Sequence, residues 1–309
     1  MEKNLYIDAS HPEETRVVLK SNSSIEEYEY ENKNKLNFKN NIYLGVVSRV
    51  EPSLQAAFVN FGRIRHGFLA FNDIQSDYYQ IPTDDKEKLK QAEEKIREEL
   101  KNSSPEETVS LESVKNVEEK QDVLADEHVK DPETISNTDN NSNNIKNNNE
   151  NIHAHKREKL KNTYGVKKYR IQEVIKPGQV VLIQVIKEER GQKGAALTTF
   201  ISLAGKYIVL MPNTAKGGGI SRKIMHPSDR KKIRGILNEI EIPKSMGIIV
   251  RTAGSNKTKN EIEKDFDNTI NTWELIRNKA VESNAPSLIY EEGDIVKRAL
   301  RDIYDNETK

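Results

Sequence analysis

The chain has 309 residues, enough for two or three compact units, and 35% of them are hydrophobic whereas 32% are charged. The mean hydropathy of −0.79 predicts that part of the chain does not fold. The lack of cysteine excludes disulfides and thiolate metal sites. Neither an apolar N-terminal signal region nor a run of about 18 apolar residues is present, so we expect a cytoplasmic protein without a transmembrane segment.

The net charge of zero hides an uneven distribution of charge along the chain. Residues 84–160 carry 20 acidic and 13 basic side chains, whereas the remainder carries 29 acidic and 36 basic ones. A basic folded part with an acidic insert suits a polyanionic partner. Ordinary surface charge is the alternative explanation.

The first 83 residues show the pattern of short strands. Alternating or continuous apolar residues at 5–7, 16–19 and 28–30 predict three strands. Residues 41–74, NIYLGVVSRVEPSLQAAFVNFGRIRHGFLAFNDI, predict three more, which are separated by glycine, proline and serine. Closely spaced strands with turn residues between them are typical of a small antiparallel barrel.

Residues 84–168 differ in composition from both of their flanks. The tract SNTDNNSNNIKNNNEN at 136–151 is polar and of low complexity, so it cannot bury enough apolar surface to become ordered. We predict that 84–168 is a disordered insertion in a barrel loop. The entropy of loop closure grows only logarithmically with length, so a loop tolerates such an insertion.

After the insertion, strands and helices are expected in turn. Residues 179–185 predict a strand, and the stretch from Lys187 to Asn213 contains closely spaced glycines that require sharp turns or a close approach to the backbone. Helices are predicted after Ser228, which we expect to be an N-cap, and after a capping box formed by Thr258 and Glu261. Residues 247–252 and 287–290 predict strands, and residues 295–303 predict a last helix.

Two groups of residues could bind a ligand. Phe58 and Phe68 lie near cations that include Lys193, and aromatic rings with cations on a small barrel can stack the bases of single-stranded nucleic acid. On spacing alone, a core role for the phenylalanines is the more common alternative.

The second group, Gly205 and Val209 with Arg251 and Thr252, offers a guanidinium fork, a hydroxyl and an exposed backbone N–H, which could hold a terminal phosphate. A lone surface arginine is again the simpler alternative.

The strings NIYLGVVSRVEPSLQAAFVNFG, RHGFL and KEERGQKGAALTTF closely resemble the ribonuclease E/G family, and the resemblance extends over residues 1–83 and 169–309. It implies an α+β fold of several subdomains, in which an S1-type OB-fold β-barrel and a 5′-sensor α/β element are inserted into an RNase H-like α/β subdomain. The RNase H-like subdomain would comprise 1–36 plus 257–309, the barrel 37–83 plus 169–203, and the 5′-sensor 204–256.

The same resemblance assigns roles to both groups. It implies that Phe58, Phe68 and Lys193 contact single-stranded RNA, and that Gly205, Val209, Arg251 and Thr252 bind the 5′-monophosphate of an RNA end.

In the family, an aspartate pair that holds Mg²⁺ and a cysteine pair that shares Zn²⁺ between subunits follow the segment matched here. We therefore expect no catalytic residue, metal site or cofactor in this chain. Neither the lone Asp8 nor the histidines His66, His153 and His155 provide a clear ligand set.

These expectations favour the RNA-binding and 5′-end-sensing part of a single-strand-specific endoribonuclease that acts in RNA processing and decay, including mRNA decay and rRNA processing. The family's activity is Mg²⁺-dependent hydrolysis, whereas this chain, truncated or one piece of a split enzyme, would bind RNA without cutting it. The expected partners are 5′-monophosphorylated single-stranded RNA and a separate chain with the nuclease subdomain. The alternatives are a stand-alone S1-type RNA-binding protein and a relic of a decaying gene.

Overall fold

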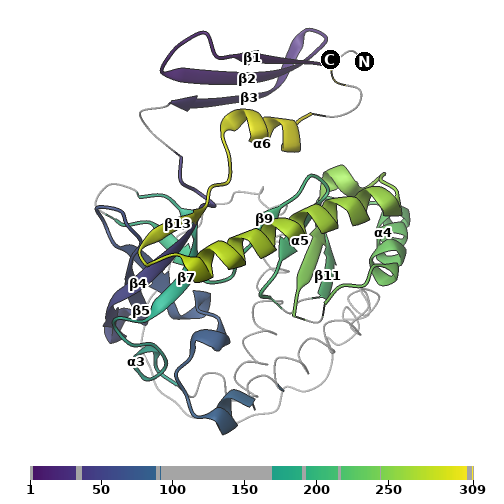
Figure 1. Ribbon diagram of the computed structural model, residues 1–309. Helices are drawn as coiled ribbons and strands as arrows, with labels where there is room; N and C mark the ends of the chain where they lie inside the picture. Colours follow the sequence, from purple (N-terminus) through teal and green to yellow (C-terminus); the bar gives the residue numbers. More distant parts are fainter. Residues whose placement is uncertain are drawn as a thin grey trace, which may run out of the picture. The chain divides into compact units, whose positions relative to one another are not determined.

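A computed structural model describes residues 3–32, 37–87, 91, 169–189, 193–214, 217–243, 245–304 and 308 (Figure 1). All of them belong to one compact unit built from residues 1–93 and 169–309. The predicted insertion, 84–168, lies outside the described residues except for 84–87 and 91, so its disorder stays a prediction.

Five strands form a closed barrel. They are β4 (Ile42–Glu51), β5 (Ala56–Asn60), β6 (Gly67–Ala70), β7 (Val180–Lys187) and β8 (Ala196–Thr198). Antiparallel pairs join β4 to β5, β5 to β6, β8 to β7 and β7 to β4, while β6 and β8 are parallel. This arrangement is an OB-fold barrel, so the predicted fold class is confirmed.

Short elements complete the barrel. A sixth strand, β13 (Ser287–Tyr290), extends its sheet by pairing with the first residues of β4. The connections contain the 3₁₀ turns η1 (Pro52–Leu54), η2 (Phe71–Asp73) and η3 (Ser76–Tyr78) and the helix α3 (Ile171–Val174). Side chains from alternate strand positions fill the interior, among them Val59, Leu69 and Ile183, each without solvent exposure.

A second sheet has the strand order β11-β12-β10-β9. Its strands are β9 (Leu203–Ala204), β10 (Ile208–Met211), β11 (Gly217–Ile220) and β12 (Gly247–Val250), and the turn η7 (Thr252–Gly254) follows β12. The helices α4 (Pro227–Glu239) and α5 (Lys259–Glu282) cover it. Buried residues from both helices, such as Ile233 and Phe266, share one core with Ile208 and Ile248 of the sheet.

Of the two predicted helix N-caps, the one of α5 is confirmed and the one of α4 is wrong. The Thr258 hydroxyl accepts a hydrogen bond from the Glu261 N–H, and the Glu261 carboxylate accepts one from the Thr258 N–H, so the predicted capping box begins α5. The prediction that Ser228 caps α4 is wrong, because His226 is the N-cap and Pro227 occupies the first helical position. Proline is favoured there, since the missing N–H would have no partner within the helix.

The third sheet contains β1 (Lys3–Asp8), β2 (Glu14–Ser21) and β3 (Ser24–Asn32), in that order. The last helix, α6 (Ile295–Asp302), packs on it through Val17, Ile295 and Ala299. By contrast, α5 contacts β9, β10 and β13. The grouping of residues 257–309 with residues 1–36 as one subdomain stays a prediction. No helix in the described part of the chain has the length and apolar composition to cross a membrane.

Candidate nucleic-acid interface

Phe58 and Phe68 lie side by side on the outer surface of the barrel. They are directly opposite each other on β5 and β6, and their ring centroids are 6.0 Å apart in an edge-to-face arrangement. Their sequence neighbours Val59 and Leu69 point into the barrel and have no exposed surface. Because successive residues of a strand face opposite sides, the two rings are half-exposed on the outside and are not core residues. Phe61 is the buried phenylalanine of this region.

Arg49 supplies the cation of this surface. It lies on β4 opposite Phe58, and its guanidinium carbon is 4.4 Å from the centre of the Phe58 ring. A guanidinium at this distance is attracted by the ring face and can also pair with a phosphate. Sequence reasoning missed Arg49. Arg63, which is closer to Phe58 and Phe68 in the sequence, instead lies with its guanidinium carbon 4.0 Å from the centre of the Phe38 ring.

Lys193 is exposed and lies just before β8, the strand that pairs with the one carrying Phe68. The Phe68 N–H donates to the Ala195 carbonyl at 2.7 Å. The backbone at Gly194 lies against that of His66, so closely that a Cβ on Gly194 would be 2.1 Å from the His66 carbonyl oxygen. Only glycine fits this position, which gives the predicted close approach its physical reason. The backbone around Lys193 is thereby fixed next to β6.

Gly205 and Arg251 meet at one end of the second sheet. The Arg251 N–H donates to the Tyr207 carbonyl at 2.8 Å, and its side-chain Nη1 donates to the Gly205 carbonyl at 2.8 Å. Thr252 follows Arg251 and is exposed. Val209 lies on β10 opposite Ile249 of β12, in the strand that begins one residue after Tyr207. The structure thus brings residues from two distant stretches of sequence to one sheet end.

Asp265 of α5 shapes this sheet end. Its carboxylate accepts hydrogen bonds from three successive backbone N–H groups, those of Lys206 at 3.1 Å, Tyr207 at 2.8 Å and Ile208 at 3.1 Å. A Cβ on Gly205 would lie 2.6 Å from the same carboxylate, so glycine is required here too. Sequence reasoning missed Asp265, because only the folded chain brings this helical acid beside the loop.

Asp302 of α6 binds the side chain of Arg251. Its carboxylate accepts from Arg251 Nη1 at 2.5 Å and from Arg301 Nε and Nη2 at 3.0 and 2.8 Å. Burial raises the pKa of Asp302, but the hydrogen bonds from Arg301 and Arg251 outweigh it, so the pKa of this carboxyl lies below its ordinary value. Asp302 is therefore ionised at neutral pH. Sequence reasoning missed this residue as well.

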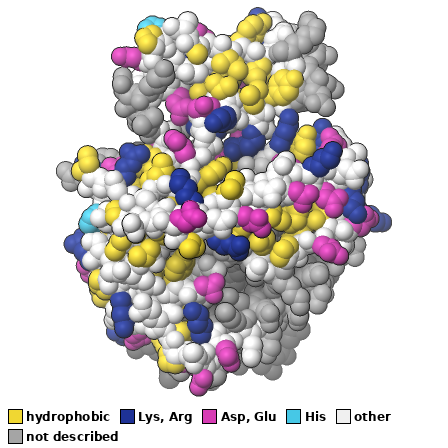
Figure 2. Space-filling model, in the orientation of Figure 1, with side chains coloured by type: hydrophobic (Ala, Val, Ile, Leu, Met, Phe, Trp, Pro, Cys, Tyr) yellow, Lys and Arg dark blue, Asp and Glu magenta, His cyan; other side chains and the backbone are white. Residues whose placement is uncertain are grey.

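Further cations surround the sheet end. The Lys257 ammonium lies 5.2 Å from the centre of the Tyr207 ring, and that of Lys206 lies 5.9 Å from it and 5.5 Å from the Tyr304 ring. Figure 2 shows Lys and Arg side chains (dark blue) next to Asp and Glu side chains (magenta) on one face of the molecule. The surface is therefore of mixed charge, and the cations act locally.

Among the described residues, no three His, Asp or Glu side chains are grouped so that they could hold a metal ion. The expectation that this chain binds no metal by itself stays a prediction.

Comparisons with known proteins point to one family. A model of the ribonuclease E/G family matches residues 202–309. Ribonuclease E of Escherichia coli (strain K12) and that of Haemophilus influenzae are each 33% identical to this chain over 300 residues, which are 97% of the chain. A putative ribonuclease E of Buchnera aphidicola subsp. Baizongia pistaciae is 31% identical over the same share. The matched region spans 21%, 23% and 53% of these three relatives, respectively.

Proposed function

The chain belongs to the ribonuclease E/G family, and from this premise we propose that it is the RNA-binding and 5′-monophosphate-sensing part of a single-strand-specific endoribonuclease acting in RNA processing and decay. The observation that carries the proposal is the outward-facing pair Phe58 and Phe68 on an OB-fold barrel, with Arg49 over one ring. Bases of single-stranded RNA stack on such rings, while cations hold the phosphates.

In the proposed function, the second sheet end recognises the 5′ terminus. Arg251 offers a guanidinium fork to the terminal phosphate, and the exposed Thr252 hydroxyl offers a further donor. Gly205 and Val209 lie at the same end, but the expected free N–H of Gly205 is wrong, because this N–H donates to the Ile208 carbonyl at 2.9 Å. Gly205 would therefore contribute through its carbonyl, which holds Arg251. RNA with a 5′-monophosphate is therefore the preferred partner.

The test compares 5′-monophosphorylated with 5′-hydroxylated single-stranded RNA of one sequence. We expect the wild-type chain to prefer the phosphorylated form, and we expect Arg251→Ala to remove about 1.5–3 kcal/mol from that preference, the usual contribution of hydrogen bonds to a charged group. Arg234→Ala, which removes an exposed arginine from α4, is the matched control and should keep the preference. Equal loss for both RNAs in Arg251→Ala would favour the second candidate, a stand-alone S1-type RNA-binding protein.

We also propose that this 309-residue chain binds RNA without cleaving it, and that Mg²⁺ and Zn²⁺ belong to other segments of the family's sequence. The measurement is incubation of labelled single-stranded RNA with the purified chain and Mg²⁺, in which the RNA should stay intact. Cleavage that chelation of Mg²⁺ abolishes would contradict this part of the proposal.

A further inference from the structure

The guanidinium of Arg251 is held by one nitrogen and open at its other edge. Both hydrogens of Nη1 are used, one by the Gly205 carbonyl at 2.8 Å and one by the Asp302 carboxylate at 2.5 Å. Within the described part of the chain, neither Nε nor Nη2 donates a hydrogen bond. These two nitrogens form the edge that binds a phosphate or carboxylate through two parallel hydrogen bonds.

The side chains of Arg251 and Asp302 are both partly exposed to solvent. The side chain of Arg251 is 28% exposed and that of Asp302 is 30% exposed. Asp302 is therefore a partly exposed residue that binds Nη1 of Arg251 and leaves its Nε and Nη2 unbound.

Asp302 is itself held in place by α6. Arg301 donates two hydrogen bonds to its carboxylate and a third, at 2.5 Å, to Glu292. The first turn of α6 is fixed by Asp294, which accepts from the Lys297 N–H, and by Glu31 of β3, which accepts from the Ile295 N–H. Both ends of the helix are thus tied to neighbouring segments, which determines where Asp302 lies.

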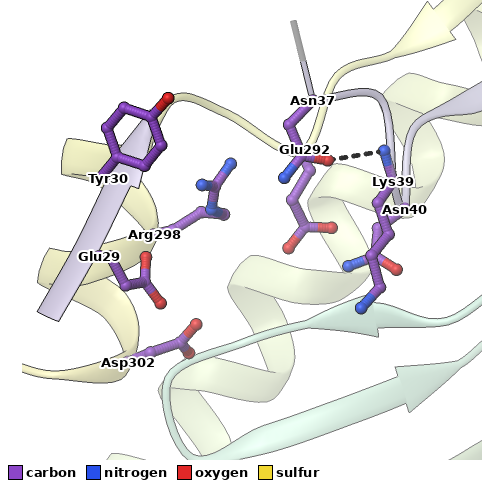
Figure 3. A pocket seen from close by; sticks show the side chains of 8 residues that line it. All are labelled: Glu29, Tyr30, Asn37, Lys39, Asn40, Glu292, Arg298 and Asp302. Atoms are coloured by element: carbon purple, nitrogen blue, oxygen red, sulfur yellow. Dashed lines mark hydrogen bonds between the residues drawn. The ribbon is translucent and has the colours of Figure 1, made fainter. Parts of the chain in front are cut away.

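The remaining side of Asp302 lines a polar cavity of about 510 Å³ (Figure 3). Arg298 also lines this cavity and pairs with Glu31 at 3.4 Å. Arg251 and Arg301 face Asp302 and Glu292, so the four charges balance, and what Arg251 offers an anion is its Nε and Nη2 edge and not a net positive charge.

We propose that Asp302 is a positioning residue for the terminal phosphate of RNA: together with the Gly205 carbonyl it holds Nη1 of Arg251, so that the Nε and Nη2 edge faces the phosphate. The inference rests on the proposed 5′-end recognition and adds the residue that orients its arginine. A free arginine side chain loses rotamer entropy when it is fixed, and a side chain that is already held loses less on binding.

The experiment measures the ratio of the dissociation constants for 5′-hydroxylated and 5′-monophosphorylated RNA in the full chain. Asp302→Ala should lower this ratio about five- to tenfold, less than Arg251→Ala does, and should leave the affinity for 5′-hydroxylated RNA within about twofold. Asp302→Asn keeps an oxygen that accepts from Nη1 and should restore most of the ratio. Asp267→Ala, which removes an exposed acid from α5, should change nothing.

A second measurement reads the arginine directly. Nitrogen-15 relaxation of the Arg251 Nε–H group, assigned with Arg251→Lys, should show restricted motion in the wild type and Asp302→Asn and faster motion in Asp302→Ala. If Asp302→Ala changed neither the ratio of dissociation constants nor the relaxation, the inference would be overturned. A higher affinity of Asp302→Ala for 5′-monophosphorylated RNA would also overturn it, because Asp302 would then compete with the phosphate for Arg251. A wild-type chain without any preference for the phosphorylated end would instead refute the proposed 5′-end recognition, and the inference with it.

Discussion

At the scale of residues, Phe58 and Phe61 have different surroundings, so we expect one to contribute to RNA binding and the other to stability. Phe58 is half-exposed beside Phe68 and Arg49, whereas Phe61 is 1% exposed and packs edge-to-face on Tyr43, with ring centroids 5.1 Å apart. Removal of the half-exposed Phe58 ring loses less buried surface than removal of Phe61, but it would remove a stacking surface for a base.

We therefore expect Phe58→Ala to weaken binding of single-stranded RNA by about 1–3 kcal/mol, the usual contribution of one stacked base. The matched control is Phe61→Ala, which should lower the free energy of unfolding by about 3–5 kcal/mol because it leaves a cavity in the core. Fluorescence anisotropy with a short RNA and urea unfolding measure the two effects. A Phe58→Ala chain that loses stability and keeps its RNA affinity would restore the core interpretation of Phe58.

The candidate phosphate site shows where reasoning from single residues stops. Arg251 and Gly205 could be proposed from their chemical types and from the family resemblance. Asp302, which binds Arg251, is the one acid within α6, but no local pattern connects it to an arginine about 50 residues earlier. Its role depends on a contact between α6 and the end of β12, and such contacts between distant segments exist only in the folded chain.

At the scale of elements, local signals were reliable where local physics decides the structure. The capping box at Thr258 is made by residues three apart, so the sequence alone predicts it. Glycines predicted to allow close approach do so at Gly194 and Gly205, where a Cβ would meet a carbonyl and a carboxylate oxygen, respectively. At α4 the informative local signal is Pro227, which favours the first helical position and so places Ser228 inside the helix and not at its N-cap.

Pairing between distant strands was less predictable. The parallel pair of β6 and β8 joins Phe68 to Ala196 across more than 100 residues, and this pair helps to close the barrel. Strand alternation shows that Phe58 and Val59 face opposite sides, but only barrel closure decides which side is the interior. For that reason, the stacking and core interpretations of Phe58 could not be separated on spacing alone.

At the scale of the whole unit, the last described elements connect all three sheets. β13 pairs with β4 of the barrel, α6 packs on β2 of the three-stranded sheet, and Asp302 at the end of α6 binds Arg251 at the end of β12. Residues 287–302 therefore join elements that are otherwise far apart in the sequence. A change at Asp302 affects the ties between sheets as well as the candidate phosphate site.

This tie makes stability depend on pH in a defined direction. The pKa of Asp302 is lowered in the folded chain, so its contribution to stability is fully present above the unfolded pKa of about 3.9 and is lost as the pH falls through the lower folded value. The facing charges are Arg251 and Arg301, which bind the carboxylate directly. The other charged side chains around the cavity are those of Glu29, Lys39, Glu292 and Arg298.

Asp302→Asn cannot ionise, so it should be less stable than the wild type by about 1 kcal/mol or less at neutral pH, because the pair is partly exposed to solvent. The difference should stay constant between about pH 8 and 5 and shrink below about pH 4, where the wild-type carboxylate becomes protonated. Urea unfolding of both chains at a series of pH values measures it, and Asp267→Ala corrects for the loss of one surface charge. A stability difference that grows toward low pH would mean that folding raises the pKa of Asp302. In that case the ion pair with Arg251 would not stabilise the contact between α6 and the second sheet.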